Sequence, residues 1–167
     1  MKKDNKSKYL QIRVTPMQKR IIKSNAKKMG MTISELILEK ALGEIKLKEK
    51  FHDYVARLNN SGEKTIAYAE VNDFLTELSG NELENAVNIL PENTLSPYER
   101  NYLTAMVEQA SMMKKIPPPG WVKDIKPLEE PRFGTGLKNL RGHLLINSPL
   151  PFRKRNIFID SAIGERV

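Results

Sequence analysis

The sequence predicts a mainly α protein that begins with a unit of one strand and two helices and ends in a Pro-rich segment. The N-terminal unit is indicated by a short alternating stretch that runs directly into two helix-capping sequences. Apolar stripes at helical spacing predict a mostly helical region behind it. Seven of the ten prolines then lie in residues 117–151, a composition that breaks regular structure. We therefore expect three parts, residues 1–47, 48–115 and 116–167.

The first element is expected to be a half-buried strand, because the side chains of residues 8–14 alternate in polarity. Its apolar positions are Leu10, Ile12 and Val14, and its polar positions are Tyr9, Gln11 and Arg13. A single strand exposes a row of unpaired amides and carbonyls, so it needs a partner. We expect that partner to be the same strand of a second chain, paired antiparallel, with the apolar side chains inside.

Two capped helices are expected directly after the strand. Thr15 and Gln18 have the spacing of a capping box, so the first helix should begin there. Gly30 follows the apolar stripe of this helix. Glycine adopts the left-handed conformation of a helix C-cap with the least strain, so the helix should end there. Thr32 and Glu35 form a second capping box two residues later.

This succession of elements resembles the ribbon-helix-helix family of DNA-binding proteins, of the MetJ, Arc and CopG type, over about a quarter of the chain. The resemblance implies a homodimer whose ribbon enters the major groove, with Tyr9, Gln11 and Arg13 as base-reading residues. It also implies that the second helix binds a backbone phosphate through its N-terminus. The expected phosphate-binding residues are Lys8, Lys27, Thr32, Ile33 and Ser34. The alternative for the strand is that its polar residues form only the solvated side of an edge strand.

The charge of the chain is divided into blocks. Residues 1–50 contain 14 Lys and Arg against 5 Asp and Glu, a net charge of +9. Residues 51–111 have a net charge of −7, and residues 112–167 have +6. A basic block beside the strand is typical of a surface that binds DNA phosphates, although lysine-rich helix faces can also be plain solvated surface.

The middle region is expected to be helical throughout. The second helix should extend to about Leu58, although Gly43 inside it costs about 1 kcal/mol relative to alanine. Apolar stripes over residues 66–78 and 83–90 predict two short helices, and a capping box at Ser96 opens a longer one.

The C-terminal segment is expected to bind a partner protein or to dock on the chain's own helices. Its candidate partner-binding residues are Phe133, Leu140, Phe152, Arg153, Arg155 and Phe158. We expect Phe152 to be exposed, because the three cations that follow it are too charged for an interior. For Trp121 we expect the opposite, a ring that docks in a groove of the chain's own helices.

Other classes of function have little support in the sequence. The chain contains no cysteine, and its two histidines stand apart from any metal-binding or nucleophile pattern, so we expect no metal, no cofactor and no enzyme. No run of 18 apolar residues is present, which favours a cytoplasmic protein without a membrane span.

Three hypotheses for the function follow from these features. The first is a dimeric repressor that acts as an antitoxin, binding its own operator and neutralising a toxin through the C-terminal region. The second is a stand-alone ribbon-helix-helix regulator or plasmid-maintenance factor whose C-terminal domain binds a ligand or further copies of itself. The third, an enzyme with an appended DNA-binding domain, has no residue to support it.

Overall fold

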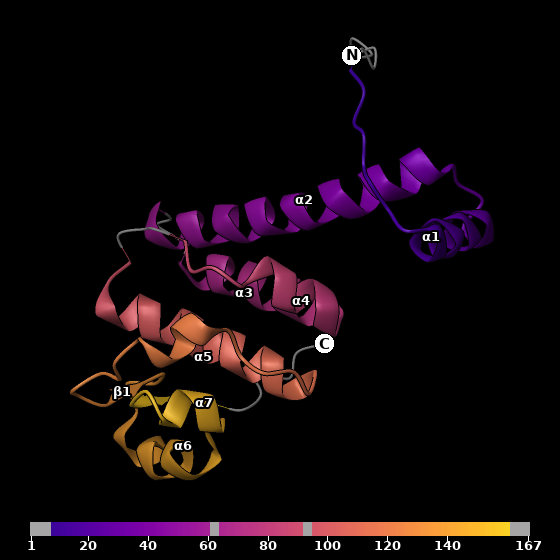
Figure 1. Ribbon diagram of the computed structural model, residues 1–167. Coiled ribbons are helices and arrows are strands. Elements are labelled where there is room, and N and C mark those ends of the chain that lie inside the picture. Colours follow the sequence, from indigo (N-terminus) through magenta and orange to yellow (C-terminus); the bar gives the residue numbers. More distant parts are fainter. Residues whose placement is uncertain (1–7, 61–63, 92–94, 161–167) are drawn as a thin grey trace. The chain divides into compact units, whose positions relative to one another are not determined.

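The computed structural model describes residues 8–60, 64–91 and 95–160 (Figure 1). The internal contacts of the chain divide it into two compact units, which we call unit 1, Met1–Gly43, and unit 2, Glu44–Val167. Helix α2, Ile33–Asn60, begins in unit 1 and continues into unit 2.

Unit 1 contains helix α1, Pro16–Lys28, and the first turns of α2. Both predicted capping boxes are present. The amide of Gln18 donates to the Thr15 hydroxyl over 3.2 Å, and the Gln18 side chain accepts from the Thr15 amide over 2.9 Å. Gly30 ends α1 with a φ of +66°, where a residue with a Cβ would be strained, as the sequence predicts.

The predicted strand over residues 8–14 is not formed in the single chain. These residues carry no regular secondary structure and extend away from α1 (Figure 1). The physical reason is that a strand exists only by hydrogen bonding to a neighbour, and no segment of the described chain pairs with this one. The paired ribbon that the sequence predicts is therefore absent from the structure of one chain.

Helix α2 continues without interruption across the boundary between the units. Gly43 lies inside it, and a Cβ added there would meet no atom within 4 Å. The helix then supplies three apolar side chains to the core of unit 2, namely Phe51, Val55 and Leu58.

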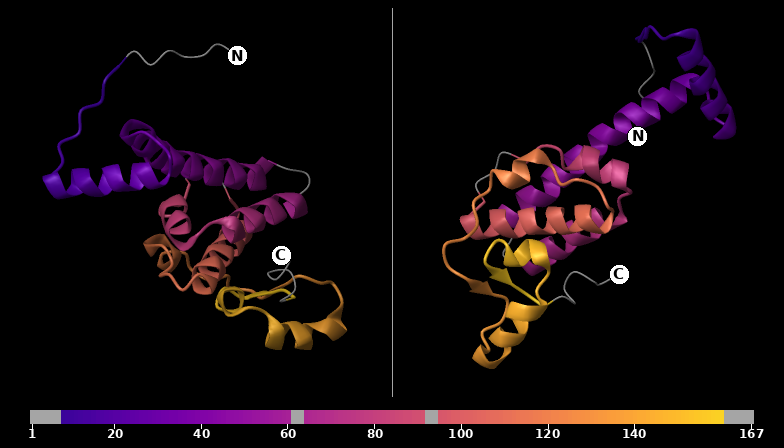
Figure 2. Two further views of the ribbon diagram at one scale, coloured as in Figure 1. Left: turned by 90° about the vertical axis from the view of Figure 1, so that its right-hand side faces the viewer. Right: turned by 60° about the horizontal axis from the view of Figure 1, so that its bottom comes forward.

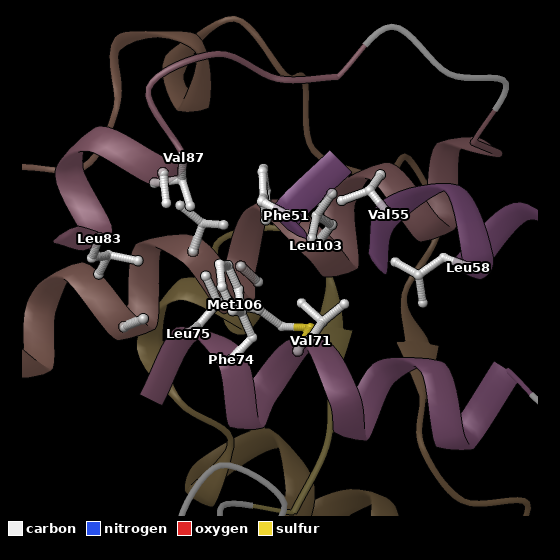
Figure 3. Packing of buried hydrophobic residues seen from close by; sticks show 14 of the residues in the cluster. Phe51, Val55, Leu58, Val71, Phe74, Leu75, Leu83, Val87, Leu103 and Met106 are labelled. Carbon is white, nitrogen blue, oxygen red and sulfur yellow. The ribbon is translucent and has the colours of Figure 1, made fainter. Parts of the chain in front are cut away.

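The core of unit 2 lies between α2, α3, α4 and α5 (Figure 3). Helix α3 spans Lys64–Glu77, α4 spans Gly80–Ala86, and α5 spans Pro97–Met113. Capping boxes begin two of these helices, at Ser79 for α4 and at Ser96 for α5. Side chains with no exposed surface come from every one of these helices; they include Val71, Leu83, Leu103 and Val107. The predicted helices of the middle region are thus present, although α4 spans Gly80–Ala86 where the sequence predicted a helix over residues 83–90.

The C-terminal segment wraps over α5 in short elements. They are η1 (Gly120–Lys123), β1 (Arg132–Phe133), η2 (Lys138–Leu140), α6 (Arg141–Asn147), α7 (Leu150–Arg153) and β2 (Ile157–Phe158). Strands β1 and β2 pair in parallel, with Arg132 opposite Ile157 and Phe133 opposite Phe158 (Figure 2). In the part of the chain that the structure describes, no helix is long and apolar enough to cross a bilayer.

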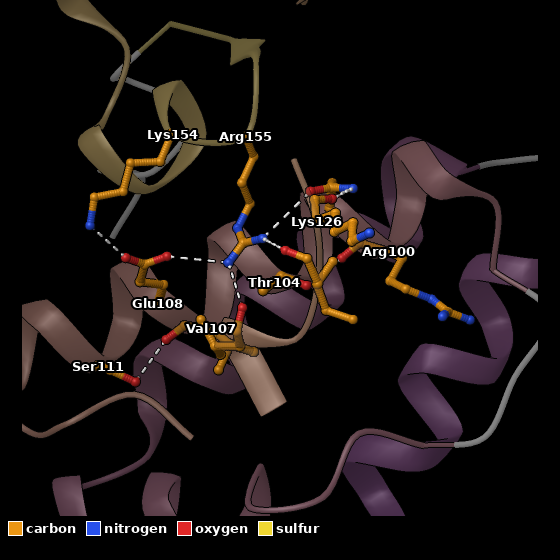
Figure 4. Close-up of polar contacts among 11 residues, drawn as sticks. Arg100, Thr104, Val107, Glu108, Ser111, Lys126, Lys154 and Arg155 are labelled. Carbon is orange, nitrogen blue, oxygen red and sulfur yellow. Dashed lines mark hydrogen bonds and ion pairs between the residues drawn. The ribbon is translucent and has the colours of Figure 1, made fainter. Parts of the chain in front are cut away.

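Arg155 holds the Pro-rich segment against α5 (Figure 4). Its buried guanidinium donates to the carbonyls of Val122 over 3.0 Å and Ile125 over 3.2 Å. The same group lies 3.5 Å from the Glu108 carboxylate on α5, which also accepts from Lys154 over 3.0 Å. A planar group with five donors can serve this many acceptors at once, which explains how an extended segment with few amides of its own is fixed in place.

Candidate nucleic-acid interface

The extended segment before α1 exposes both of its faces. The polar side chains of Tyr9, Gln11 and Arg13 are exposed. The alternating apolar side chains are exposed as well, to 75% for Leu10, 53% for Ile12 and 41% for Val14. Monomeric proteins seldom leave consecutive apolar positions of one strand face in water. This exposure fits a segment whose apolar face is covered by another chain.

Helix α1 adds a strongly basic surface. It contains no acidic residue, and its basic residues are Lys19, Arg20, Lys23, Lys27 and Lys28, all exposed. Lys19, Lys23 and Lys27 follow one another at intervals of four, so they line one side of the helix. Like charges at this spacing destabilise a helix by a few tenths of a kcal/mol each, a cost that a polyanion would remove.

Of these three lysines, only Lys27 is among the predicted phosphate-binding residues. The interval of four in the sequence is the signal by which Lys19 and Lys23 could have been found.

The N-terminus of α2 is capped and open to solvent. The Thr32 hydroxyl accepts from the Glu35 amide over 3.2 Å, and the Glu35 carboxylate accepts from the Thr32 amide over 2.9 Å. In a helix the first amides have no carbonyl one turn earlier to bond to, which leaves those of Ile33 and Ser34 directed outward. Of the three residues predicted here, Thr32 therefore contributes its side chain to the cap, while Ile33 and Ser34 retain amides that can bind a phosphate.

The structure brings four of the predicted partner-binding residues into contact with the chain's own elements. Phe133 stacks on Phe158 with ring centroids 5.1 Å apart. Phe158 is 9% exposed, Phe152 is 4% exposed and Arg155 is 5% exposed. The other two, Leu140 and Arg153, are exposed.

The expected exposure of Phe152 is wrong. Its ring packs edge-on against Tyr102 at 5.2 Å, inside the core of unit 2. The premise was that the cations after Phe152 could not lie in an interior. Arg155 does lie there, because two carbonyls and Glu108 receive its guanidinium. Burial lowers the pKa of Arg155, and the nearby Glu108 carboxylate opposes that shift.

The expectation for Trp121 is confirmed. Its indole Nε1 donates to the Val87 carbonyl over 2.8 Å, and its partly buried ring packs on the core of unit 2. Neither histidine takes part in a cluster of three or more His, Asp or Glu side chains within residues 8–60, 64–91 and 95–160.

Comparison with known proteins gives one match. Residues 4–65, a little over a third of the chain, match the model of the NikA-like family, described as mobilization protein NikA. This family is of the ribbon-helix-helix type. The matched residues cover all but the first three of unit 1 and continue through α2, and residues 66–167 lie outside them. No curated protein and no solved structure matches the chain.

Proposed function

We propose that this chain is a cytoplasmic, dimeric DNA-binding protein that marks a specific site on mobilizable DNA. Two features support the proposal. Unit 1 has the capped helix pair and alternating segment typical of a ribbon-helix-helix protein, and the matched family carries the description of a mobilization protein. The main observation in support of the proposal is that the apolar side chains of Leu10, Ile12 and Val14 are exposed directly before a basic helix.

The binding mechanism follows from pairing two such segments. An antiparallel ribbon of two chains covers the three apolar side chains and satisfies the free backbone groups of both segments. The side chains of Tyr9, Gln11 and Arg13 then emerge on the opposite face. Arg13 can bond guanine O6 and N7, and Gln11 can bond adenine N6 and N7. The amides of Ile33 and Ser34 hold a phosphate and fix the register.

The test is selection of bound fragments from sheared DNA of the genetic element that encodes the protein, followed by footprinting of the enriched site. We expect a two-fold symmetric footprint. Arg13→Ala should weaken the specific site by about 1–3 kcal/mol and relax preference at one base pair per half-site. Lys8→Ala and Lys27→Ala should weaken specific and random DNA alike, with a shallower dependence on salt.

A matched control is Lys46→Ala, which removes an exposed positive charge from unit 2. It should leave the affinity for the selected site nearly unchanged. Equal losses for Arg13→Ala on selected and random DNA would contradict the assignment of the base-reading face. Failure to enrich any site would contradict the function itself.

The antitoxin hypothesis is the weaker of the two regulatory alternatives. It relied on aromatic anchors in the C-terminal region, and Phe152 and Phe158 are buried within unit 2. The matched family description concerns mobilization and names no toxin. We therefore favour the role of a stand-alone DNA-binding factor without catalytic activity, in which unit 2 serves association.

A further inference from the structure

Helix α6 and its flanking turns form an exposed apolar surface in unit 2. We call residues 137–150 the α6 tip. Figure 1 shows α6 at one end of unit 2, on the far side of α5 from α4. In α6 itself only Leu144 is buried, and Ile146 is 74% exposed. An apolar surface that the chain's own fold leaves in water to this degree marks a site of interaction. The exposed apolar side chains of the tip are Leu137, Leu140, Leu145, Ile146 and Leu150.

The charge around the α6 tip is of one sign. Residues 131–159 contain six Lys and Arg and no Asp or Glu. Two of the six are paired with Glu108 on α5. The acidic residues nearest in sequence, Glu130 and Asp160, lie at the two ends of the stretch, so the tip itself carries positive charge only. The four remaining cations are exposed, and they are Arg132, Lys138, Arg141 and Arg153.

The C-terminal end of α6 is hydrogen-bonded within the chain. The His143 carbonyl accepts from the Asn147 side chain over 3.0 Å, and the Leu144 carbonyl accepts from the Ser148 amide over 3.0 Å. The next residue is Pro149, which has no amide that needs a partner. The last carbonyls of a helix otherwise depend on water. Because two of them are satisfied here by the chain itself, this end of the helix can leave water at little cost.

The kinds of side chain in the α6 tip distinguish between possible partners. All of its exposed apolar residues are leucine or isoleucine. Protein interfaces draw most of their binding energy from tryptophan, tyrosine and arginine, and leucine is under-represented there. Single-stranded DNA needs aromatic rings on which its bases stack, whereas the one ring within the tip is the polar imidazole of His143, in contact with Asn147.

A duplex and a bilayer also make different demands on the tip. The phosphates of duplex DNA would accept the cations but would leave the aliphatic side chains in water. The interface of an anionic bilayer accepts both, because aliphatic side chains enter the acyl boundary while Lys and Arg remain among the headgroups. The composition of the tip therefore favours a lipid surface.

We propose that the α6 tip binds the surface of a bilayer that contains anionic lipids. Leu145 and Ile146 enter the boundary between headgroups and acyl chains, and Lys138 and Arg141 lie among the phosphates of the headgroups. The long aliphatic stems of the two cations allow their charges to stay at the headgroups while their apolar neighbours go deeper. Binding of this kind is interfacial and needs no helix that spans the bilayer. The inference goes beyond DNA binding and is tested without DNA.

The test measures where the tip lies when the full-length chain meets vesicles. The chain contains no cysteine, so Ile146→Cys can be labelled at that position alone with an environment-sensitive fluorophore. The vesicles consist either of equal parts of phosphatidylglycerol and phosphatidylcholine or of phosphatidylcholine only. We expect the emission of the label to shift to the blue with the anionic vesicles and to change little with the neutral ones.

The control is Ile45→Cys with the same label, which replaces a similarly exposed isoleucine beside a lysine on α2. Its emission should stay that of a label in water. This control also separates the tip from the basic helix α1, because adsorption through α1 would bring the chain to the vesicle and leave both labels in water.

Substitutions in the unlabelled chain then test both halves of the contact by co-sedimentation with the anionic vesicles. Ile146→Ser should lower the partition coefficient about tenfold, whereas Ile45→Ser should not. Lys138→Gln should lower it about fivefold at low salt and much less at high salt, and Lys46→Gln is its control. All four variants change exposed side chains, so their melting temperatures should stay close to that of the unchanged protein.

Three outcomes would overturn the proposal. One is an emission from the label at residue 146 that anionic vesicles leave unchanged or that neutral vesicles change equally. Another is a blue shift of the same label when unlabelled protein is added without vesicles, which would mean that a second copy covers the tip. The third is a loss of DNA affinity in Lys138→Gln with unchanged partition, which would make the tip a DNA contact. None of these outcomes bears on the ribbon, so failure here is distinguishable from failure of the proposed function.

Discussion

Arg155 and Lys154 offer a matched test of how the C-terminal segment is held. The two cations are adjacent in sequence and share Glu108, yet the side chain of Arg155 is 6% exposed and that of Lys154 is 54% exposed. Arg155→Ala removes the donor to the carbonyls of Val122 and Ile125 and leaves them inside the fold without a partner. Lys154→Ala removes one exposed ion pair and leaves no buried group unsatisfied.

The expected magnitudes differ by several-fold. Removing one partner of a buried charge network costs about 3–5 kcal/mol. Removing an exposed ion pair costs about 0–1 kcal/mol. For a protein of this size, these values correspond to a fall in melting temperature of roughly 6–20 °C for Arg155→Ala and roughly 0–4 °C for Lys154→Ala. Arg155→Met should behave like Arg155→Ala, because methionine fills the volume but donates no hydrogen bond.

The assay is a thermal melt of each variant followed by circular dichroism, with limited proteolysis of the proline segment as a second measurement. Arg155→Ala and Arg155→Met should expose cleavage sites between residues 122 and 132, and Lys154→Ala should not. Melting temperatures for Arg155→Met equal to that of the unchanged protein would show that the guanidinium contributes no net stability. The account of how this segment is fixed would then be wrong.

Three further predictions concern other parts of the chain. Residues 1–47 alone should dimerise and fold in a concentration-dependent manner, because their apolar face is exposed in one chain; a folded monomer in sedimentation would refute this. Trp121→Phe should cost about 1 kcal/mol of stability in a urea melt through loss of the bond to the Val87 carbonyl. Burial raises the pKa of the Glu99 carboxyl, but hydrogen bonds from Lys64 and Ser96 outweigh burial, so the pKa is lowered overall. The ionised carboxylate therefore stabilises the fold, and this contribution is fully present above the ordinary carboxyl pKa. Glu99→Gln should therefore be less stable than the unchanged protein at pH 7, and the difference should shrink as pH falls from the ordinary carboxyl pKa through the lowered pKa of Glu99.

The features that sequence determines locally could be predicted well. The capping boxes at Thr15 and Ser96 and the left-handed Gly30 depend on residues within one turn, and all three occur in the structure. The predicted strand before Thr15 is not formed in one chain, because a strand exists only by hydrogen bonding to a neighbour, and the neighbour expected from the sequence is a second copy of the chain.

The environment of the C-terminal residues could not be predicted in the same way. Whether Arg155 is buried depends on the carbonyls of residues 122 and 125, some 30 positions earlier, and no local pattern reveals that they converge on it. The error in the exposure of Phe152 followed directly from this. In the same way, the pocket that Glu84, Val87 and Pro117–Pro119 line arises from two separate stretches, residues 84–88 and 111–120, and has no signature in the sequence.

Gly43 has a consequence for how cooperative the whole chain is. It occupies the middle of a continuous helix, and the open space around it would accept a methyl group at no steric cost. Alanine there would stabilise the helix by about 1 kcal/mol. Glycine therefore makes this the position in α2 where the helix unfolds locally at the lowest cost in free energy. Melting that begins in unit 1 therefore need not spread along the helix into unit 2. Unit 1, the proposed DNA-binding part, can therefore lose its structure while unit 2 stays folded.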